Sequence, residues 1–215
     1  MSVQDFMTKD VVTVTSTTPI FDAIDLMKKH DIHRLPVIDN GKLSGLITEG
    51  TIAEATPSKA TSLSVYEMNY LLNKTTVGDV MVKHVKTTTP DALLEDAIYE
   101  MRENNINVLP VCDGTQLVGI ITNNDIFDAF LRITGYNAGG TRITLQITDD
   151  HTGVLAAITS LLAEKNYSIA TIVVNPMELS TIIELQIESR STDELQQVFE
   201  KAGYTVLSAV LTNNH

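Results

Sequence analysis

The most chemically suggestive pattern in the chain is a hydroxyl residue followed three positions later by a carboxylate. Gly119-Ile120-Ile121-Thr122-Asn123-Asn124-Asp125 places Thr122 and Asp125 at the expected start of a helix. Free backbone N–H groups at such a start favour an anion, and a carboxylate can accept hydrogen bonds from two neighbouring hydroxyl groups. The same spacing is typical of a capping box, in which the two side chains only terminate the helix. Both interpretations, ligand contact and helix cap, are open at this level.

The elements that must position this pattern occur twice. Residues 3–55 align with 77–129 without a gap, at a constant offset of 74, and about 22 of the paired positions are identical. Each copy combines a helical apolar pattern, as over 20–27, with two apolar runs joined by a tight turn. Asn40-Gly41 favours such a turn because both residues tolerate positive φ. Each copy therefore predicts a βαββα unit, which is too small to bury its faces alone, so we expect the two copies to pack sheet to sheet.

Beyond a glycine-rich stretch the periodicity changes, and strand and helix patterns follow the order βαββαβ, the ferredoxin-like motif. The expected fold class is α+β. The expected domains are a first repeat over 1–60, a connecting helix and linker over 61–76, a second repeat over 77–134, a linker over 135–141 and a C-terminal domain over 142–215.

Composition and charge exclude several classes of function. The chain has 27 Asp and Glu against 15 Lys and Arg, a net charge of -12 that disfavours nucleic acid and anionic membranes as partners. No apolar run approaches the roughly 20 residues of a membrane span, and the first residues lack a signal-peptide pattern, so we expect a cytoplasmic protein. No convergent set of metal ligands and no nucleophile motif is found, so we expect no metal, no catalytic residue and no enzyme activity.

Residues 1–134 resemble a pair of CBS domains, the Bateman module, through the repeat and the glycine-to-aspartate motif that ends at Asp125. In that family the cleft between the copies binds adenosine nucleotides or related adenosyl ligands. The resemblance implies that Asp125 accepts hydrogen bonds from the ribose hydroxyls and that Thr122 contacts a phosphate. Copy one departs from the motif because Thr51 stands where the carboxylate is expected, which favours a structural role there.

The resemblance also implies further contacts with the nucleotide. The segment before the helix of copy two and the strand that enters its proline would contact the adenine, and two basic residues of copy one would reach the phosphate. The expected nucleotide-binding residues, in addition to Thr122 and Asp125, are Val85, Thr87, Asn107, Val108, His33, Arg34, Thr48 and Thr13.

The C-terminal part resembles an ACT domain, a regulatory module that often binds amino acids between subunits. The corresponding turn reads Asp150-His151-Thr152-Gly153-Val154-Leu155, with Thr152 in place of the proline that the family favours. Gly153 permits a close backbone approach, so free N–H groups of the following helix could meet a ligand carboxylate. Two interpretations are open: an amino acid or small metabolite binds at this turn, or the domain only dimerises.

The order of these parts, with the connector Ser64-Val65-Tyr66-Glu67, is similar to the AcuB-type acetoin-utilisation family. That resemblance implies a homodimeric, non-enzymatic regulator of acetoin-related or central carbon metabolism that acts through a partner enzyme. It implies no cofactor, but a regulatory ligand such as AMP, ADP, ATP or S-adenosylmethionine. The alternative is a ligand-free oligomerisation or protein-interaction module that scaffolds a metabolic enzyme, and a small nucleotide-hydrolysing enzyme is the third hypothesis.

Overall fold

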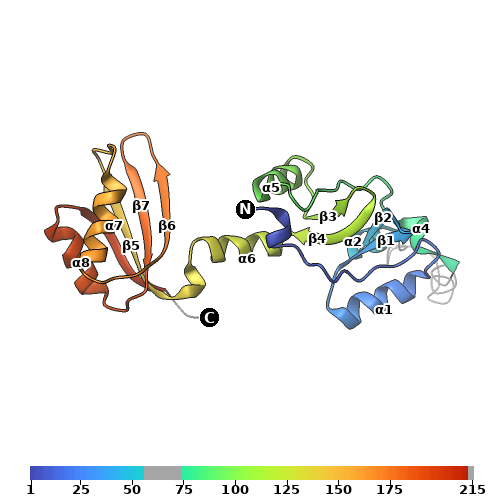
Figure 1. Cartoon of the computed structure of the whole chain (residues 1–215). Coiled ribbons are helices and arrows are strands. Elements are labelled where there is room, and N and C mark those ends of the chain that lie inside the picture. The colour runs from blue at the N-terminus through green and yellow to red at the C-terminus, as the bar shows by residue number, and fades with distance from the viewer. Residues whose placement is uncertain (56–73, 213–215) are drawn as a thin grey trace. The chain divides into compact units, whose positions relative to one another are not determined.

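The computed structural model describes residues 1–55 and 74–212. These residues form two compact units, Met1–Ile126 and Phe127–His215, which are described separately (Figure 1). The division falls inside helix α6, Asn123–Ile133. Most of the predicted connector over 61–76, including the residues 64–67 used for the family resemblance, lies outside the described residues.

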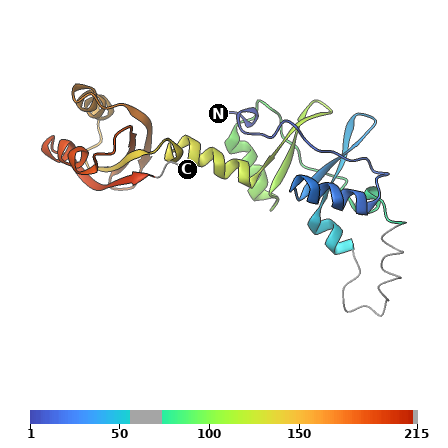
Figure 2. The same ribbon diagram turned by 90° about the horizontal axis from the view of Figure 1, so that it is seen from below.

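The first unit contains the duplicated elements that the sequence predicts. Copy one contributes α1 (Ile20–His30), β1 (Arg34–Asp39), β2 (Lys42–Thr48) and α2 (Glu49–Ala55). Copy two contributes α5 (Leu94–Glu103), β3 (Val108–Asp113), β4 (Gln116–Thr122) and α6. Each strand pair is an antiparallel hairpin, and the two hairpins are drawn in blue and green in Figure 2. The predicted turn is confirmed, because Asn40 and Gly41 have φ of 52° and 76°.

The prediction of a first strand in each βαββα unit is wrong. The segments that precede α1 and α5 form short helical turns, Val3–Asp5 and α4 (Val77–Val80), and then touch the hairpins only through single bridges. The bridge in copy one joins Val14 to Val37. In copy one a longer strand does not form because the hydroxyls of Thr15, Thr17 and Thr18 hydrogen-bond locally, as Thr18 does when it accepts the N–H of Thr15 at 3.1 Å.

The lead-in segments of the two copies, residues 1–12 and 75–86, cross reciprocally. The N–H of Ile20 at the start of α1 donates to the carbonyl of Thr75, and the N–H of Leu94 at the start of α5 donates to that of Met1, both at 3.1 Å. Each lead-in therefore satisfies a free amide at the first turn of the other copy's helix. Val77 accordingly belongs to the buried core of copy one, with Ile20, Met27 and Leu35.

The motif glycines lie where these lead-in segments cross the hairpins. A Cβ on Gly119 would lie 2.5 Å from Met7 Sδ, and one on Gly45 would lie 2.5 Å from Met81 Sδ. Beside Gly119, Thr8 and Ile120 exchange two backbone hydrogen bonds of 2.9 Å. Only glycine allows the backbones to approach this closely, which explains the glycine in each copy.

The second unit has the predicted order βαββαβ. Its elements are β5 (Gly140–Ile147), α7 (Val154–Glu164), β6 (Ile169–Pro176), β7 (Thr181–Ile187), α8 (Thr192–Lys201) and β8 (Thr205–Thr212). The strands form one antiparallel sheet in the order β6-β7-β5-β8, and both helices cover the same face of it (Figures 1 and 2). Alternate residues of the central strands, such as Ile143 and Leu185, pack against Ile158 and Phe199 of the helices.

The glycine-rich stretch over 135–141, which the sequence predicts as a linker, is bound to this sheet. It contains the turn Tyr136–Ala138 and the first residues of β5. The side chain of Gln186 donates to the carbonyl of Gly139, and Arg142 donates to the carbonyl of Thr134 at 2.9 Å. The stretch therefore continues the packing of the second unit.

Candidate functional site

A cavity of about 300 Å³ in the first unit gathers residues of both copies. Copy one contributes its lead-in and the residues between α1 and β1, and copy two contributes the end of β4 and the start of α6. The lining residues are Thr8, Asp10, Val11, Val12, Asp31, Ile32, His33, Arg34, Ile120, Thr122, Asn124 and Asp125. The volume lies at the lower end of the roughly 300–1,000 Å³ of small-molecule sites.

Thr122 and Asp125 form the capping box that their spacing allows. Oδ2 of Asp125 accepts hydrogen bonds from the backbone N–H and the hydroxyl of Thr122, both at 2.7 Å, and the N–H of Asp125 reaches the Thr122 hydroxyl at 3.5 Å. Within the described residues, Oδ1 of Asp125 has no hydrogen-bond partner. The cap therefore occupies one oxygen and leaves the other available to a ligand hydroxyl, so that the two interpretations of this motif are compatible.

Arg34 approaches the same carboxylate from copy one. Burial lowers the pKa of the Arg34 guanidinium, and the negative charge of Asp125 raises it in part. An arginine remains protonated at neutral pH in any such setting. Among the described residues no side chain accepts a hydrogen bond from this guanidinium, so its fork of donors can bind an anionic or polar ligand group.

His33 lines the cavity, but its imidazole already contacts the carboxylate of Glu49. Its Nδ1 lies 2.9 Å from Oε2 of Glu49, and the two side chains are 64% and 61% exposed. The carbonyl of His33 also accepts the N–H of Glu49 at 3.1 Å. These contacts tie the start of β1 to the start of α2, so the imidazole is less free than Arg34 to bind a phosphate.

The other expected nucleotide contacts lie elsewhere. Val85 and Thr87 line a second cavity of about 240 Å³, together with Lys42, Lys83 and Cys112. Asn107, Val108, Thr13 and Thr48 line neither of these two cavities.

The reciprocal crossing explains this separation. It brings the lead-in of copy one, residues 8–12, beside Thr122 and Asp125 of copy two. The family resemblance instead predicted that the corresponding segment of copy two, with Val85 and Thr87, contacts the same ligand as Thr122 and Asp125. Val11 and Val12, which occupy the positions of Val85 and Lys86 at the offset of 74, were therefore missed. Asp10 was missed for the same reason. Asp31 and Ile32, which directly precede the expected His33 and Arg34, also line the cavity but were not predicted.

Copy one has a cap without a carboxylate. The hydroxyl of Thr51 accepts the N–H of Thr48 at 2.9 Å and donates to the carbonyl of Thr48 at 2.9 Å. The N–H of Thr51 in turn reaches the hydroxyl of Thr48 at 3.1 Å. Thr51 thus replaces the capping function of an aspartate but offers no charged acceptor to a ribose.

The turn before α7, which the resemblance to an ACT domain predicts as a ligand site, already makes hydrogen bonds within the protein. Oδ2 of Asp150 accepts the hydroxyl of Thr181 at 2.7 Å, and Nδ1 of His151 lies 3.0 Å from the carbonyl of Asp149. Gly153 has φ of 105°, which glycine adopts without strain, and leaves open space where a side chain would lie. Around it, Thr152 and Leu155 are exposed and Val154 is buried at the start of α7.

The described part of the chain contains neither a metal site nor a membrane-spanning helix. No group of three or more His, Cys, Asp or Glu residues in the described ranges has the arrangement of a metal site. No helix within 1–55 or 74–212 combines the length and the apolar character that a membrane crossing requires.

Comparison with known proteins identifies the duplicated part. The CBS domain profile matches residues 3–58 and 77–132. The CBS domain-containing protein YhcV of Bacillus subtilis is 34% identical over 125 residues, which are 58% of this chain and 82% of YhcV.

Solved structures match the same part. The CBS domain pair of protein MJ0100, in complex with 5′-methylthioadenosine and S-adenosyl-L-methionine, is 32% identical with a TM-score of 0.51 over 60% of this chain and 95% of that one. CBSX2 in complex with AMP is 27% identical with a TM-score of 0.52, over 61% and 97%. A structure named as the acetoin utilization protein AcuB of Vibrio cholerae is 30% identical with a TM-score of 0.52, over 61% and 90%.

The profile thus covers both copies of the repeat, and the structural matches share their α+β fold. A CBS pair is a regulatory module. The chain belongs to the CBS domain family and carries a tandem CBS pair.

Proposed function

We propose that this protein is a non-enzymatic regulator whose CBS pair binds an adenosine nucleotide or another adenosyl ligand in the cavity at Asp125. The observation that carries the proposal is the convergence of Thr122 and Asp125 from copy two with Arg34 from copy one around a single cavity. Oδ1 of Asp125 would accept the ribose hydroxyls, and the Arg34 guanidinium would contact the group at the 5′ end. The ligands of the MJ0100 pair and of CBSX2 share this adenosyl part.

Binding between the copies gives the ligand a means of regulation. The cavity wall belongs to both copies, so a ligand that favours one placement of the copies shifts the population towards it. A coupling of about 1–3 kcal/mol changes the affinity for a partner by roughly 5- to 150-fold. We propose that the second unit, an ACT-like domain, mediates this response and supports a homodimer, with an amino acid or small metabolite binding at Gly153. The likeness to the AcuB structure supports the proposal of a role in acetoin-related carbon metabolism. We further propose that the protein is cytoplasmic and acts through a partner enzyme.

The assembly hypothesis rests on a different observation. The edge strands of the second unit expose apolar side chains, among them Val174 on β6 and Leu207 and Val210 on β8, which are 42%, 53% and 49% exposed. Exposed apolar edges favour pairing with another chain. A module that only oligomerises would use these edges and ignore adenosyl ligands.

The substitution that separates the two hypotheses is Asp125→Thr. Copy one shows that threonine at this position completes the cap by itself, so the variant removes the carboxylate and preserves the helix start. Calorimetric titration with AMP, 5′-methylthioadenosine and S-adenosylmethionine should show binding to the parent and at least tenfold weaker binding to the variant. Asp113→Asn, a change of the same charge at the exposed last residue of β3, is the control and should bind as the parent does. No binding by the parent, or equal binding by Asp125→Thr, would favour the assembly module.

A further inference from the structure

The charges that line the Asp125 cavity are mainly negative. Asp10, Asp31 and Asp125 contribute three carboxylates. Arg34 is the one permanent cation among the described residues that line it, and His33 already contacts the carboxylate of Glu49. The whole chain adds to this field, since its net charge is -12. Arg34 can neutralise one negative charge of a ligand. A second negative charge would meet no other permanent cation among these lining residues and would be repelled by the three aspartates.

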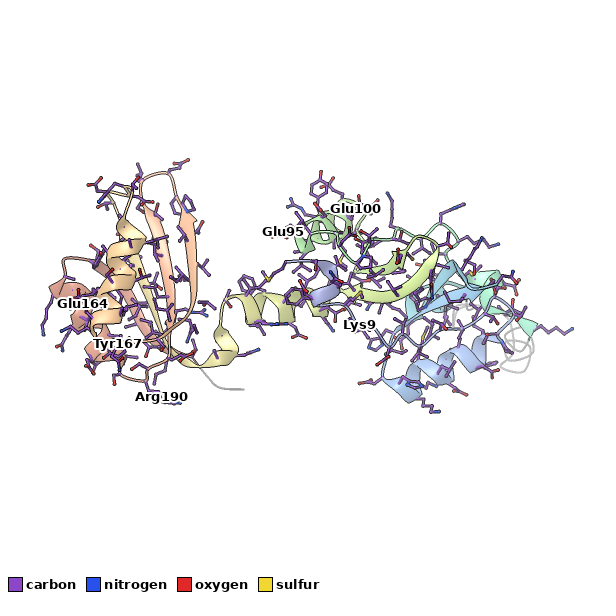
Figure 3. The ribbon with its side chains drawn as sticks, in the orientation of Figure 1. Lys9, Glu95, Glu100, Glu164, Tyr167 and Arg190 are labelled. Carbon is purple, nitrogen blue, oxygen red and sulfur yellow. The ribbon has the colours of Figure 1, made fainter. Side chains whose placement is uncertain are left out.

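The other copy shows that the repeat does not require these acids. At the offset of 74, His84 replaces Asp10, Asn105 replaces Asp31 and Thr51 replaces Asp125. The backbone is the same at one of these positions, because Asp31 and Asn105 both have positive φ, 52° and 51°. The equivalent position of Val12 carries Lys86, whose Nζ lies 3.8 Å from Oε2 of Glu100. Glu100, on α5, is labelled in Figure 3. The three aspartates are therefore particular to one cleft and are not demanded by the fold.

We propose, resting on the function proposed above, that this cavity selects adenosyl ligands with a neutral or cationic 5′ group and rejects nucleoside di- and triphosphates. A thioether nucleoside or a sulfonium brings no phosphate towards Asp10 and Asp31, and a sulfonium is attracted by them. A triphosphate brings several negative charges into a cavity that has one permanent cation to receive them. Two like charges about 4 Å apart repel by about 1 kcal/mol even in water, which is about fivefold in affinity for each pair.

Competition among ligands of one nucleoside tests the selection. Titrations in magnesium-free buffer at low salt would compare 5′-methylthioadenosine, S-adenosylmethionine, AMP and ATP. We expect the parent to bind the first two at least tenfold more tightly than ATP. Raising the salt towards about 1 M should narrow this gap, because the screening length then falls to roughly 3 Å and the repulsion between the exposed carboxylates and the phosphates weakens.

The variants Asp10→Asn and Asp31→Asn, alone and together, report on the aspartates themselves. Asparagine at position 31 suits the left-handed backbone, as Asn105 does in copy two. Each change should raise the affinity for ATP relative to that for 5′-methylthioadenosine about fivefold. Asp113→Asn makes the same change in net charge outside the cavity and should leave the preference unaltered.

The outcomes distinguish this inference from the function on which it rests. If no adenosyl ligand binds, or if Asp125→Thr binds them all unchanged, both fail. If the ligands bind and depend on Asp125, but ATP binds as tightly as the thioether nucleoside, the charge selection alone is overturned. The same holds if the double Asp10→Asn and Asp31→Asn variant keeps the preference of the parent. A preference that the double variant abolishes, with Asp113→Asn unchanged, supports the selection.

Discussion

Replacing Gly45 by alanine should destabilise the first unit more than the same change at Gly119. A Cβ at position 45 would lie 2.8 Å from the carbonyl oxygen of Val82, whereas one at position 119 would lie 3.1 Å from that of Thr8. Each would also lie 2.5 Å from a methionine sulfur, but a thioether at the end of a flexible side chain can move aside. The backbone of Val82 or Thr8 cannot move without stretching its hydrogen bonds across the bridge. The distance from the new Cβ to the carbonyl oxygen therefore decides which variant loses more stability.

Overpacking of a well-packed core costs about 1–3 kcal/mol. Both crossings are held by two backbone hydrogen bonds of 2.9 Å, which a shift of the backbone would weaken. We expect Gly45→Ala near the upper end, because its closer approach to the Val82 carbonyl forces the larger shift, and Gly119→Ala near the lower end. Removing the sulfur in a Gly45→Ala and Met81→Ala double variant should recover less than half of the loss caused by Gly45→Ala.

Urea unfolding followed by circular dichroism measures these differences, since the chain contains no tryptophan. Gly50→Ala is the matched control. Gly50 is exposed on α2, and its Cβ would meet only the Thr48 hydroxyl at an ordinary 3.5 Å, so alanine should stabilise the helix by up to about 1 kcal/mol. An unchanged midpoint for Gly45→Ala, or a larger loss for Gly119→Ala, would refute the reasoning.

Binding should follow the opposite order. Thr8 and Ile120 line the Asp125 cavity, so a displacement at Gly119 moves its wall, whereas Leu46 and Val82 do not line it. At a temperature where both variants are folded, Gly119→Ala should bind the adenosyl ligand more weakly than Gly45→Ala. Equal affinities would show that this crossing does not position the site.

Two further predictions concern single carboxylates. Thr51→Asp should give copy one a carboxylate with the geometry of Asp125, and calorimetry should then detect a second adenosyl site; an unchanged stoichiometry would contradict this. The hydroxyl of Ser44 and the N–H and hydroxyl of Ser16 hold the pKa of Asp39 below its ordinary value. A lowered folded pKa contributes stability that is present above the unfolded value of about 3.9 and is lost as the pH falls through the folded pKa. Asp39→Asn should therefore flatten the decline in unfolding free energy below about pH 4, and a decline as steep as the parent's would contradict this.

The sequence was sufficient for the elements that short-range patterns determine. The repeat, the turn at Asn40-Gly41 and the βαββαβ order of the second unit were all predicted correctly. The approach of Arg34 to Thr122 and Asp125 was also expected, because the family resemblance places both around one cleft.

Long-range pairing could not be predicted from such patterns. The apolar lead-in segments predict strands by their composition, yet each pairs with the other copy, as Thr8 does with Ile120 and Val82 with Leu46, at a distance in the sequence that local patterns do not reach. That exchange decides which lead-in faces Asp125, so Asp10 and Val11 were missed. The identical motif glycines carried a signal, since a glycine inside a strand marks a close backbone approach, but they do not name the approaching segment.

Because of the reciprocal crossing, the two copies must fold together. Copy one expressed alone would lack part of its own core. Without the lead-in of copy two, the space that Val77 fills beside Ile20 and Met27 would be empty. The smallest autonomous fragment of the first unit therefore contains both copies. Deleting either copy should therefore unfold the other. Copy one is needed as a scaffold for the site at Asp125, even though Thr51 leaves its own cleft without the carboxylate.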